Sequence, residues 1–341
     1  MNPPFNHIVV IGASAGGVSA LLEISSHLPR FFPAPVCIVQ HVGNNPSMMP
    51  ELLRYRGPNH AMHVEDGQRL TSGTLHVAPP DCHLLVDGDR LYLTHGPKEN
   101  HARPAIDPLF RTAALSWGAR VIGVILTGQM DDGAAGLRAV QDCGGLTIVQ
   151  DPATAVEPEM PRSALAAVQP DYCVPLSEIA PLLQRLVGTL AAPVPAPVPV
   201  PVPEQVIREV AINKGDASME NVAAIGSPSS LTCPDCGGSL WEVKETRPLR
   251  YRCHTGHAYS SISLARAQQE NSELALRNGV RALRERELLL RRVAAIAEAT
   301  GDRKQAAAGV AHADRLRLQM ESLAEMVNSG ASRVEEEDLN A

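Results

Sequence analysis

The sequence contains few lysines and no long apolar run, and each absence excludes a class of protein. Its lysines are Lys98, Lys214, Lys244 and Lys304, and 30 Lys and Arg residues against 37 Asp and Glu residues leave a net charge of -7. This balance excludes the broad basic surface of a nucleic-acid-binding protein. No apolar run reaches the roughly 18 residues of a membrane-spanning helix, and the N-terminus lacks the pattern of a secretory signal peptide. We expect a cytoplasmic protein with no nucleic-acid partner and no membrane insertion.

The sequence also lacks the cysteine spacing of a disulfide framework, although it has seven cysteines. Four of them stand singly in apolar segments, where small core residues are expected. These four are Cys37, Cys82, Cys143 and Cys173. The remaining three lie together in the second half of the chain, which at 341 residues is long enough for more than one domain.

A short stretch near the N-terminus combines a strand, a turn and a helix. The apolar run of residues 8–11 predicts a strand buried on both faces, and residues 18–28 predict the helix that follows. Ser14 lies on the turn between them, and Gly12-x-Ser14-x-Gly16 has the spacing of a nucleophile elbow, which lifts a serine hydroxyl clear of the backbone. The same glycines also fit a dinucleotide-binding turn, so this stretch alone leaves an esterase and an oxidoreductase open.

Two further predicted strands end in residues that suit a serine nucleophile. Residues 36–40 form a buried-strand run that ends at His41, and residues 121–126 form another that leads to Asp131 and Asp132. Because the carboxyl ends of parallel strands share one edge of a sheet, we expect the hydroxyl, the imidazole and a carboxylate to meet there. A serine nucleophile needs a base, and that base needs a carboxylate to orient it. Either aspartate could instead cap the helix that follows.

The dinucleotide-binding alternative fits the same residues less well. It calls for an acidic residue at the end of the second strand, where this chain has His41. No lysine follows a tyrosine at the Tyr-x-x-x-Lys spacing of a short-chain dehydrogenase. An NAD(P)-binding oxidoreductase and a non-catalytic signalling scaffold remain the two alternatives to an esterase.

Residues 60–110 have shorter apolar runs and more turns than the segments around them. The Asp87-Gly88 turn predicts a β-hairpin, which we expect to be an antiparallel extension of a doubly wound, mostly parallel sheet in an α/β fold. The histidines of this region lack metal-ligand spacing, and most of them are interpreted as surface or turn residues. They are His63, His76, His83, His95 and His101.

Six motifs follow one another along the first half of the chain. They are Gly12-Ala13-Ser14-Ala15-Gly16-Gly17, Val39-Gln40-His41, Val77-Ala78-Pro79 with His83, Arg103-Pro104-Ala105-Ile106-Asp107, Leu126-Thr127-Gly128 with Asp132-Gly133-Ala134-Ala135-Gly136, and Gln150-Asp151 with Met160-Pro161-Arg162-Ser163-Ala164. Together they resemble the catalytic domain of the chemotaxis receptor methylesterase family, CheB. The resemblance implies an α/β fold, hydrolysis of glutamyl methyl esters on the cytoplasmic domains of chemoreceptors with release of methanol, and deamidation of certain receptor glutamines. It implies no cofactor for catalysis.

Carried over position by position, the resemblance makes Ser14 the nucleophile, His41 the base and Asp132 the orienting carboxylate. In the mechanism that we expect, His41 deprotonates Ser14, which attacks the ester carbonyl, and backbone N–H groups of residues 15–17 bind the oxyanion. Water activated by the same histidine then hydrolyses the acyl-enzyme.

The chain departs from the family pattern at three places beside these residues. Ala15 stands where the family frequently has a hydroxyl residue, Gln129-Met130 replaces a more usual Met-Gly, and Asp131 falls where the family often has asparagine. The best-known members also carry a receiver domain ahead of the catalytic domain, whereas the first strand here is expected to begin at residue 7. We expect no control by phosphorylation within this chain.

Alternate prolines from Pro193 to Pro203 predict a semi-rigid polyproline spacer and hence a domain boundary. A short amphipathic run at residues 206–212 and then a polar, mobile segment are expected to follow it. The predicted domains are a catalytic domain at 1–190, a linker at 191–230, a zinc-ribbon-like module at 231–262, a helical hairpin at 263–328 and an acidic tail at 329–341.

The three clustered cysteines have the spacing of a zinc ribbon. Cys233, Cys236 and Cys253 supply three ligands, and His257 is preferred as the fourth, because His254 adjoins Cys253 and would strain a tetrahedral site. We expect a structural zinc with no open position for catalysis, the alternative being free or redox-active cysteines. A similar segment accompanies some receiver-less members of the family.

The last part of the chain is rich in Ala, Leu, Arg and Glu. Residues 263–299 and 304–327, joined by the turn Thr300-Gly301-Asp302, predict an antiparallel helical hairpin. We interpret the hairpin as a packing or oligomerisation element, with docking of a signalling partner as the alternative. Residues 335–338 are acidic and are expected to be solvated and disordered.

Overall fold

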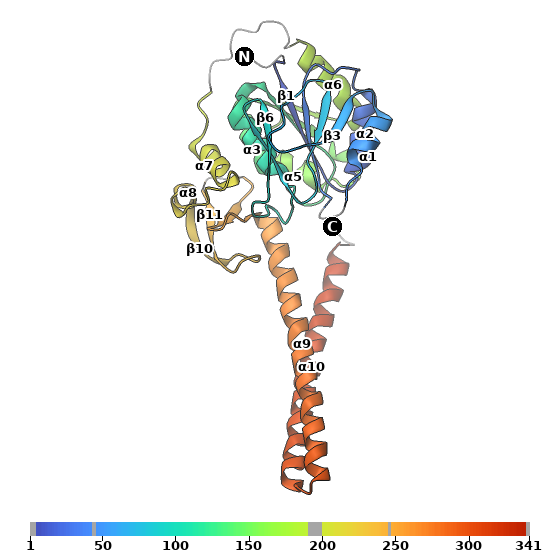
Figure 1. Ribbon diagram of the computed structural model, residues 1–341, viewed down its shortest axis with the longest axis vertical. Coiled ribbons are helices and arrows are strands. Elements are labelled where there is room, and N and C mark those ends of the chain that lie inside the picture. Colours follow the sequence, from blue (N-terminus) through green and yellow to red (C-terminus); the bar gives the residue numbers. More distant parts are fainter. Residues whose placement is uncertain (1–4, 43–45, 190–199, 245–246, 339–341) are drawn as a thin grey trace. The chain divides into compact units, whose positions relative to one another are not determined.

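The computed structural model describes residues 5–42, 46–189, 200–244 and 247–338 (Figure 1). The chain divides into two compact units, Met1–Leu264 and Ala265–Ala341. None of the helices in the described ranges combines the length and the apolar character that a membrane span requires.

The first unit is built on a seven-stranded sheet with the strand order β3-β4-β2-β1-β7-β8-β9. Every neighbouring pair in this sheet is parallel. The central strands are short apolar runs buried along their whole length, as expected when helices cover both faces of a sheet. The strands are β1 (Ile8–Ala13), β2 (Val36–Gln40), β3 (His60–His63), β4 (Thr74–Val77), β7 (Val121–Ile125), β8 (Leu146–Gln150) and β9 (Tyr172–Val174).

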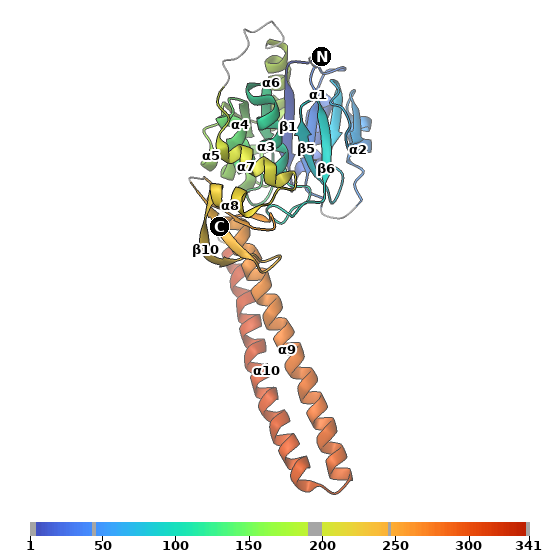
Figure 2. The same ribbon diagram turned by 60° about the vertical axis from the view of Figure 1, so that its left-hand side comes forward.

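Helices pack on both faces of this sheet, so the fold is doubly wound, as predicted. One apolar core joins the sheet to α1 (Gly17–His27), α2 (Met49–Arg56) and α6 (Leu176–Thr189). The other joins it to α3 (Ile106–Trp117), α4 (Ala134–Asp142) and α5 (Glu159–Ala167). Figure 2 shows α1 and α2 on one side of β1 and α3, α4 and α5 on the other. Two short 3-10 helices complete this part, Gly118–Arg120 and Pro152–Thr154.

The predicted hairpin is present as β5 (His83–Asp87) and β6 (Arg90–Thr94), but it is a separate two-stranded sheet rather than an extension of the parallel one. The reason is its packing on α3. Val86 donates its N–H to Thr112 Oγ1 at 3.0 Å, and Trp117 Nε1 donates to the Gly88 carbonyl at 2.7 Å. The hairpin therefore lies over a helix and adds no strand to the edge of the main sheet.

Two of the five histidines of this region are not surface residues. His76 and His83 are buried. The Thr71 N–H donates to His76 Nε2, and the Ala105 N–H donates to His83 Nδ1. Both rings are thus satisfied core groups, and burial lowers the pKa of each, that of His76 to about 4.

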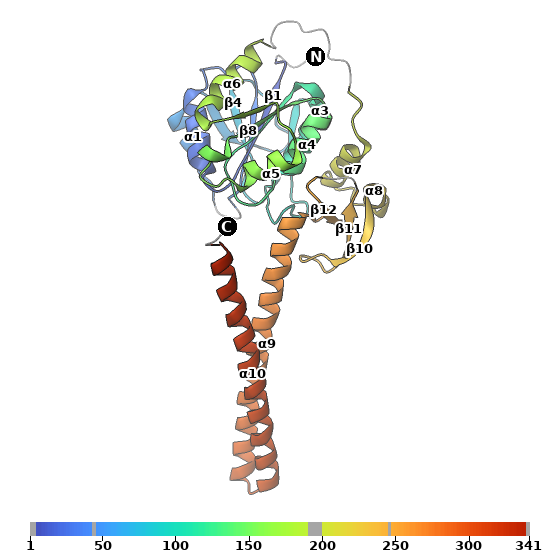
Figure 3. The ribbon, with the colours of Figure 1, turned by 180° about the vertical axis from the view of Figure 1, so that it is seen from behind.

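Most of the segment between residues 200 and 264 is folded, including much of the predicted linker. It contains α7 (Glu204–Asn213), α8 (Met219–Ile225) and a four-stranded antiparallel sheet, the ribbon, made of β10 (Gly226–Thr232), β11 (Ser239–Val243), β12 (Arg250–Cys253) and β13 (Ala258–Ser260) (Figure 3). Val206 and Val210 of α7 join the core around α3, while Val222 and Ile225 of α8 pack with Ile212. Residues 193–199 of the predicted polyproline spacer lie outside the described residues.

The second unit contains most of α9 (Ser261–Ala299) and all of α10 (Arg303–Asp338). The two helices form the predicted antiparallel hairpin, which turns at Gly301 with φ of 87°. Small buried residues where α9 and α10 meet allow the two helices to pack closely, and Arg291 on α9 forms an ion pair with Asp314 on α10. Helix α10 continues through Asp338, so residues 335–338 are helical and not disordered.

Candidate active site

Three adjacent strands at the centre of the sheet bring the predicted triad together. Ser14 follows β1, His41 follows β2 and Asp132 lies in the loop after β7, and β1 pairs with both β2 and β7. Backbone hydrogen bonds also join the residues that follow these strands. The His41 N–H donates to the Ala13 carbonyl at 3.1 Å, and the Ser14 N–H donates to the Thr127 carbonyl at 3.0 Å.

The three side chains form one hydrogen-bonded relay. Ser14 Oγ lies 3.1 Å from His41 Nδ1, and His41 Nε2 lies 2.8 Å from Asp132 Oδ2. The imidazole is 20 % exposed and the carboxylate 2 %. The hydroxyl is thus placed to lose its proton to a ring whose second nitrogen is held by a buried anion.

The turn that carries Ser14 has no room for larger residues. Gly16 has φ of 76°, and a Cβ there would lie 2.7 Å from Val156 Cβ. A Cβ on Gly17 would lie 2.1 Å from Gln40 Oε1. The Gln40 amide in turn donates to the Ser14 carbonyl at 2.8 Å. The glycines of the motif are therefore required by close packing around the nucleophile.

Asp132 is held by several donors from three segments of the chain. They are His41 Nε2 at 2.8 Å, Asn100 Nδ2 at 3.1 Å, the Ile106 N–H at 2.6 Å and the Asp107 N–H at 3.3 Å. Burial by itself would raise the pKa of Asp132, but the hydrogen bonds and the charge of His41 outweigh it, and the pKa lies below its usual value. The carboxylate therefore stays ionised and acceptor-only.

Neither aspartate of the loop caps α4 with its side chain. The buried Asp107 does so instead, because its Oδ1 accepts from the N–H groups of Gly133 at 3.1 Å and Gly136 at 2.6 Å. Burial and the nearby charge of Asp132 raise the pKa of Asp107 to about 7. Burial likewise raises the pKa of Asp131 to about 6, although a hydrogen bond from Ser260 acts in the opposite direction.

A hollow of about 240 Å³ opens beside the relay, bordered by His41, Asn100 and Met130. Lys98 and Arg103 also line it, so its lining carries positive charge. Met130 has φ of 64°, in the left-handed region, and its N–H donates to Glu159 Oε2 at 2.6 Å. The loop with the Gln129-Met130 departure is thus tied to α5 at the rim of the hollow.

The ribbon brings its four predicted metal ligands together. The ligand atoms of Cys233, Cys236, Cys253 and His257 all lie within 4.8 Å of one another, whereas His254 is exposed and outside the cluster. Cys236 Sγ and Cys253 Sγ are 3.8 Å apart. A tetrahedral zinc with Zn–S bonds of about 2.3 Å separates its sulfur ligands by about 3.8 Å. The cluster fits a metal of this kind.

Comparison with known proteins agrees with the fold and the site. The profile of the CheB methylesterase family matches residues 9–183. The chain belongs to the CheB methylesterase family. It is 42% identical over 184 residues to a Leptospira interrogans protein that bears the name protein-glutamate methylesterase/protein-glutamine glutaminase, a match that covers 52% of this chain and 93% of that one. The α/β fold and the carboxylic ester hydrolase class predicted from the sequence are thereby confirmed.

Two more relatives extend the comparison. The protein-glutamate methylesterase FrzG of Myxococcus xanthus is 38% identical over 189 residues, which are 54% of this chain and 56% of that protein. The crystal structure of the Thermotoga maritima CheB methylesterase catalytic domain matches with a TM-score of 0.51 and 35% identity, over 53% of this chain and 99% of that one. The family match, residues 9–183, lies in the doubly wound part of the chain and ends before the ribbon and the helical hairpin.

Several residues of the site escaped the sequence analysis. Asn100 and Ser260 belong to no sequence motif and act through contacts with residues far along the chain. Gln40 and Asp107 appear in the sequence only as members of family motifs, which assign them no role. In the structure Gln40 binds the Ser14 carbonyl, and Asp107 binds the first turn of α4.

Proposed function

We propose that this chain is a protein-glutamate methylesterase that acts on the cytoplasmic domains of chemoreceptors, and that it also deamidates receptor glutamines. The observation that carries the proposal is the Ser14, His41 and Asp132 relay at one sheet edge, in a chain of the CheB methylesterase family. Its site of action would be the cytoplasm. The dinucleotide-binding alternative finds no support at the end of β2, where the side chain is an imidazole bonded to Ser14.

The mechanism follows from the relay. His41 takes the Ser14 proton at Nδ1, and Oγ attacks the γ-carbonyl of a methylated glutamate. The imidazolium is stabilised by Asp132 and returns the proton to the departing methoxide, which leaves as methanol. His41 then deprotonates a water, which attacks the acyl-enzyme carbonyl, and the imidazolium returns this proton to Ser14 Oγ as the receptor glutamate side chain is released.

The oxyanion of each tetrahedral intermediate needs donors close to Ser14. Of the three backbone N–H groups expected to bind the oxyanion, that of Gly17 already donates to the Ser14 carbonyl at 2.8 Å. The N–H groups of Ala15 and Gly16 are therefore the proposed oxyanion donors. Lys98 lines the hollow and would attract acidic side chains of a substrate, whereas Arg103 is already paired with Asp81.

Zinc is the metal that the ribbon site fits best. Cys233, Cys236, Cys253 and His257 would hold it as a closed four-coordinate site, so it would stabilise the ribbon and take no part in ester hydrolysis. Metal analysis of the full chain should find one zinc, and Cys236→Ser should lower this content. A full chain that is folded and free of metal under reducing conditions would reject the site.

The catalytic assignment is tested by methanol release from methylated receptors. Ser14→Ala should lower kcat by several orders of magnitude, because no other group can form the acyl-enzyme. Ser19→Ala, the same change at an exposed position of α1, is the matched control and should leave kcat unchanged. Substantial activity in the Ser14 variant would refute the mechanism.

A further inference from the structure

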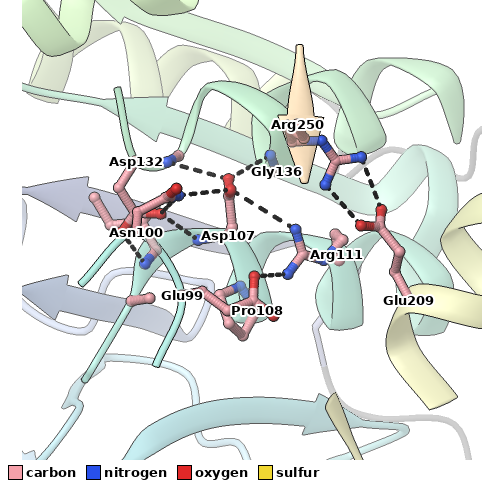
Figure 4. Close-up of polar contacts among 12 residues, drawn as sticks. Glu99, Asn100, Asp107, Pro108, Arg111, Asp132, Gly136, Glu209 and Arg250 are labelled. Carbon is pink, nitrogen blue, oxygen red and sulfur yellow. Dashed lines mark hydrogen bonds and ion pairs between the residues drawn. The ribbon is translucent and has the colours of Figure 1, made fainter. Parts of the chain in front are cut away.

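The ribbon is connected to the catalytic aspartate through a single side chain, Asn100. Asn100 Nδ2 donates to Asp132 Oδ1 at 3.1 Å (Figure 4), and its own N–H donates to the Ala258 carbonyl at 2.8 Å. Its Oδ1 accepts from the Ser260 N–H at 2.9 Å and from Ser263 Oγ at 3.0 Å. The amide therefore bridges the sheet edge and the end of the ribbon.

The ribbon determines which way this amide points. The two ends of an asparagine amide have similar shapes but opposite hydrogen-bonding roles. A backbone N–H can only donate, and the Ser260 N–H is shared between Asn100 Oδ1 and Ser263 Oγ, so it favours the oxygen of Asn100 on its side. The NH2 group then faces Asp132. A flipped amide would turn its oxygen towards an ionised carboxylate and lose that hydrogen bond.

A second bridge runs beside the first. Ser260 Oγ donates to Asp131 Oδ1 at 2.7 Å. Ser260 and Ser263 are 2 % and 0 % exposed, so water does not compete for these bonds. Ser260 Oγ also accepts the Ser263 N–H at the start of α9, which gives Ser260 a structural role as well.

A buried ion network holds the ribbon in this position. Glu99, next to Asn100, binds Arg111 of α3 and Arg252 of the ribbon, and Glu209 of α7 binds Arg250 through both carboxylate oxygens at 2.6 and 3.0 Å (Figure 4). All five side chains are buried. The contact between ribbon and sheet is thus specific, since the buried Arg250 and Arg252 of the ribbon find their counter-charges, Glu209 and Glu99, outside the ribbon.

We propose that the ribbon completes the active site: Asn100 is a positioning residue for Asp132, and Ser260 and Ser263 fix the orientation of its amide. The proposal rests on the proposed esterase function. Loss of the positioning hydrogen bond lets the Asp132 carboxylate move and misaligns His41, which slows attack by Ser14.

The test is a mutant cycle in the full chain with Ser263→Ala, Asn100→Ala and the double variant. Methanol release gives kcat and KM, and the burst with p-nitrophenyl acetate gives the rate of Ser14 acylation without a receptor. Each single variant should lower kcat by about 10- to 100-fold, and Ser263→Ala, which does not line the hollow, should do so with little change in KM. The double variant should be no slower than Asn100→Ala, because Ser263 acts through Asn100. Ser229→Ala, which removes a ribbon hydroxyl bonded to the Leu240 carbonyl, should leave kcat unchanged.

Each alternative result has a distinct meaning. Variants with wild-type kcat, or effects of Ser263 and Asn100 that multiply independently, would overturn the proposal. A fall in activity that follows only a lower melting temperature would also overturn it, in favour of a purely structural role. If the wild type releases no methanol from any receptor but reacts with the p-nitrophenyl ester, the receptor function fails, and the acylation rates still decide the role of Asn100.

Discussion

Asp131 is a buried carboxyl group whose ionisation should cost stability, and Asp131→Asn should remove that cost. Its Oδ1 accepts from Ser260 Oγ at 2.7 Å, whereas its buried Oδ2 has no hydrogen-bond partner. Burial raises its pKa to about 6. An asparagine keeps the acceptor for Ser260 and has nearly the shape of the protonated acid, but it never becomes charged.

The expected gain in stability follows from the difference between the pKa of Asp131 in the folded state and in the unfolded chain. A raised pKa means that the folded state retains its proton at a pH where the unfolded chain, with a pKa of about 3.9, has lost it. Stability contributed by this proton is present at low pH and is lost as the pH rises from about 4 to above 6. The gap of about two pKa units corresponds to about 3 kcal/mol. The variant should therefore exceed the wild type by about 3 kcal/mol at pH 8 and by about 1 kcal/mol at pH 4.5.

Urea denaturation of both proteins at pH 4.5 and pH 8 measures this difference, because all other titrating groups are shared and cancel. Asp216→Asn, at an exposed position of the same unit, is the control and should change stability equally little at both pH values. A gain for Asp131→Asn that does not change with pH, or a loss at pH 8, would refute the argument that burial of the charge is the cost.

Three further predictions concern the ribbon and the nucleophile turn. Glu99→Gln should lower the free energy of unfolding by about 3–5 kcal/mol in urea denaturation, because Arg111 and Arg252 lose a buried counter-charge. An effect no larger than that of the control Glu51→Gln, which alters an exposed ion pair, would contradict this prediction. Removal of the ribbon metal with a chelator should lower the melting temperature and kcat together and leave KM nearly unchanged. A wild-type kcat in folded, metal-free protein would argue against a link between the ribbon and the catalytic relay. Gly17→Ala should lower kcat at least tenfold in the methanol assay, since its Cβ would lie 2.1 Å from Gln40 Oε1; an unchanged kcat would show that the turn adapts.

The sequence predicts the relay because its determinants are local. Each triad member follows a short apolar run, and such runs identify buried parallel strands whose carboxyl ends meet at one edge. The zinc ligands are predictable for a similar reason, because the cysteine spacing is itself the signal. Both arguments need only the order of elements along the chain.

Asn100 could not be predicted in this way. Its partners Asp132 and Ser260 lie 32 and 160 residues away, and neither contact leaves a periodic pattern. Helix α8 escaped prediction for a related reason. Its two buried apolar residues, Val222 and Ile225, form an apolar cluster only together with Ile212 of α7, so the segment is polar when considered alone.

The position of the ribbon at Asp132 has a physical reason. Ser14 and His41 must stay accessible to a protein substrate, and the imidazole is 20 % exposed beside the hollow. A module that contacted the relay from that side would block entry of the receptor. Asp132, at 2 % exposure, is the one triad member that another part of the chain can hold without covering the substrate site. Substitutions in the ribbon should therefore lower kcat, the rate of the chemical step, whereas substitutions of Lys98 should raise KM by weakening substrate binding. A ribbon variant that raised KM and spared kcat would contradict this division.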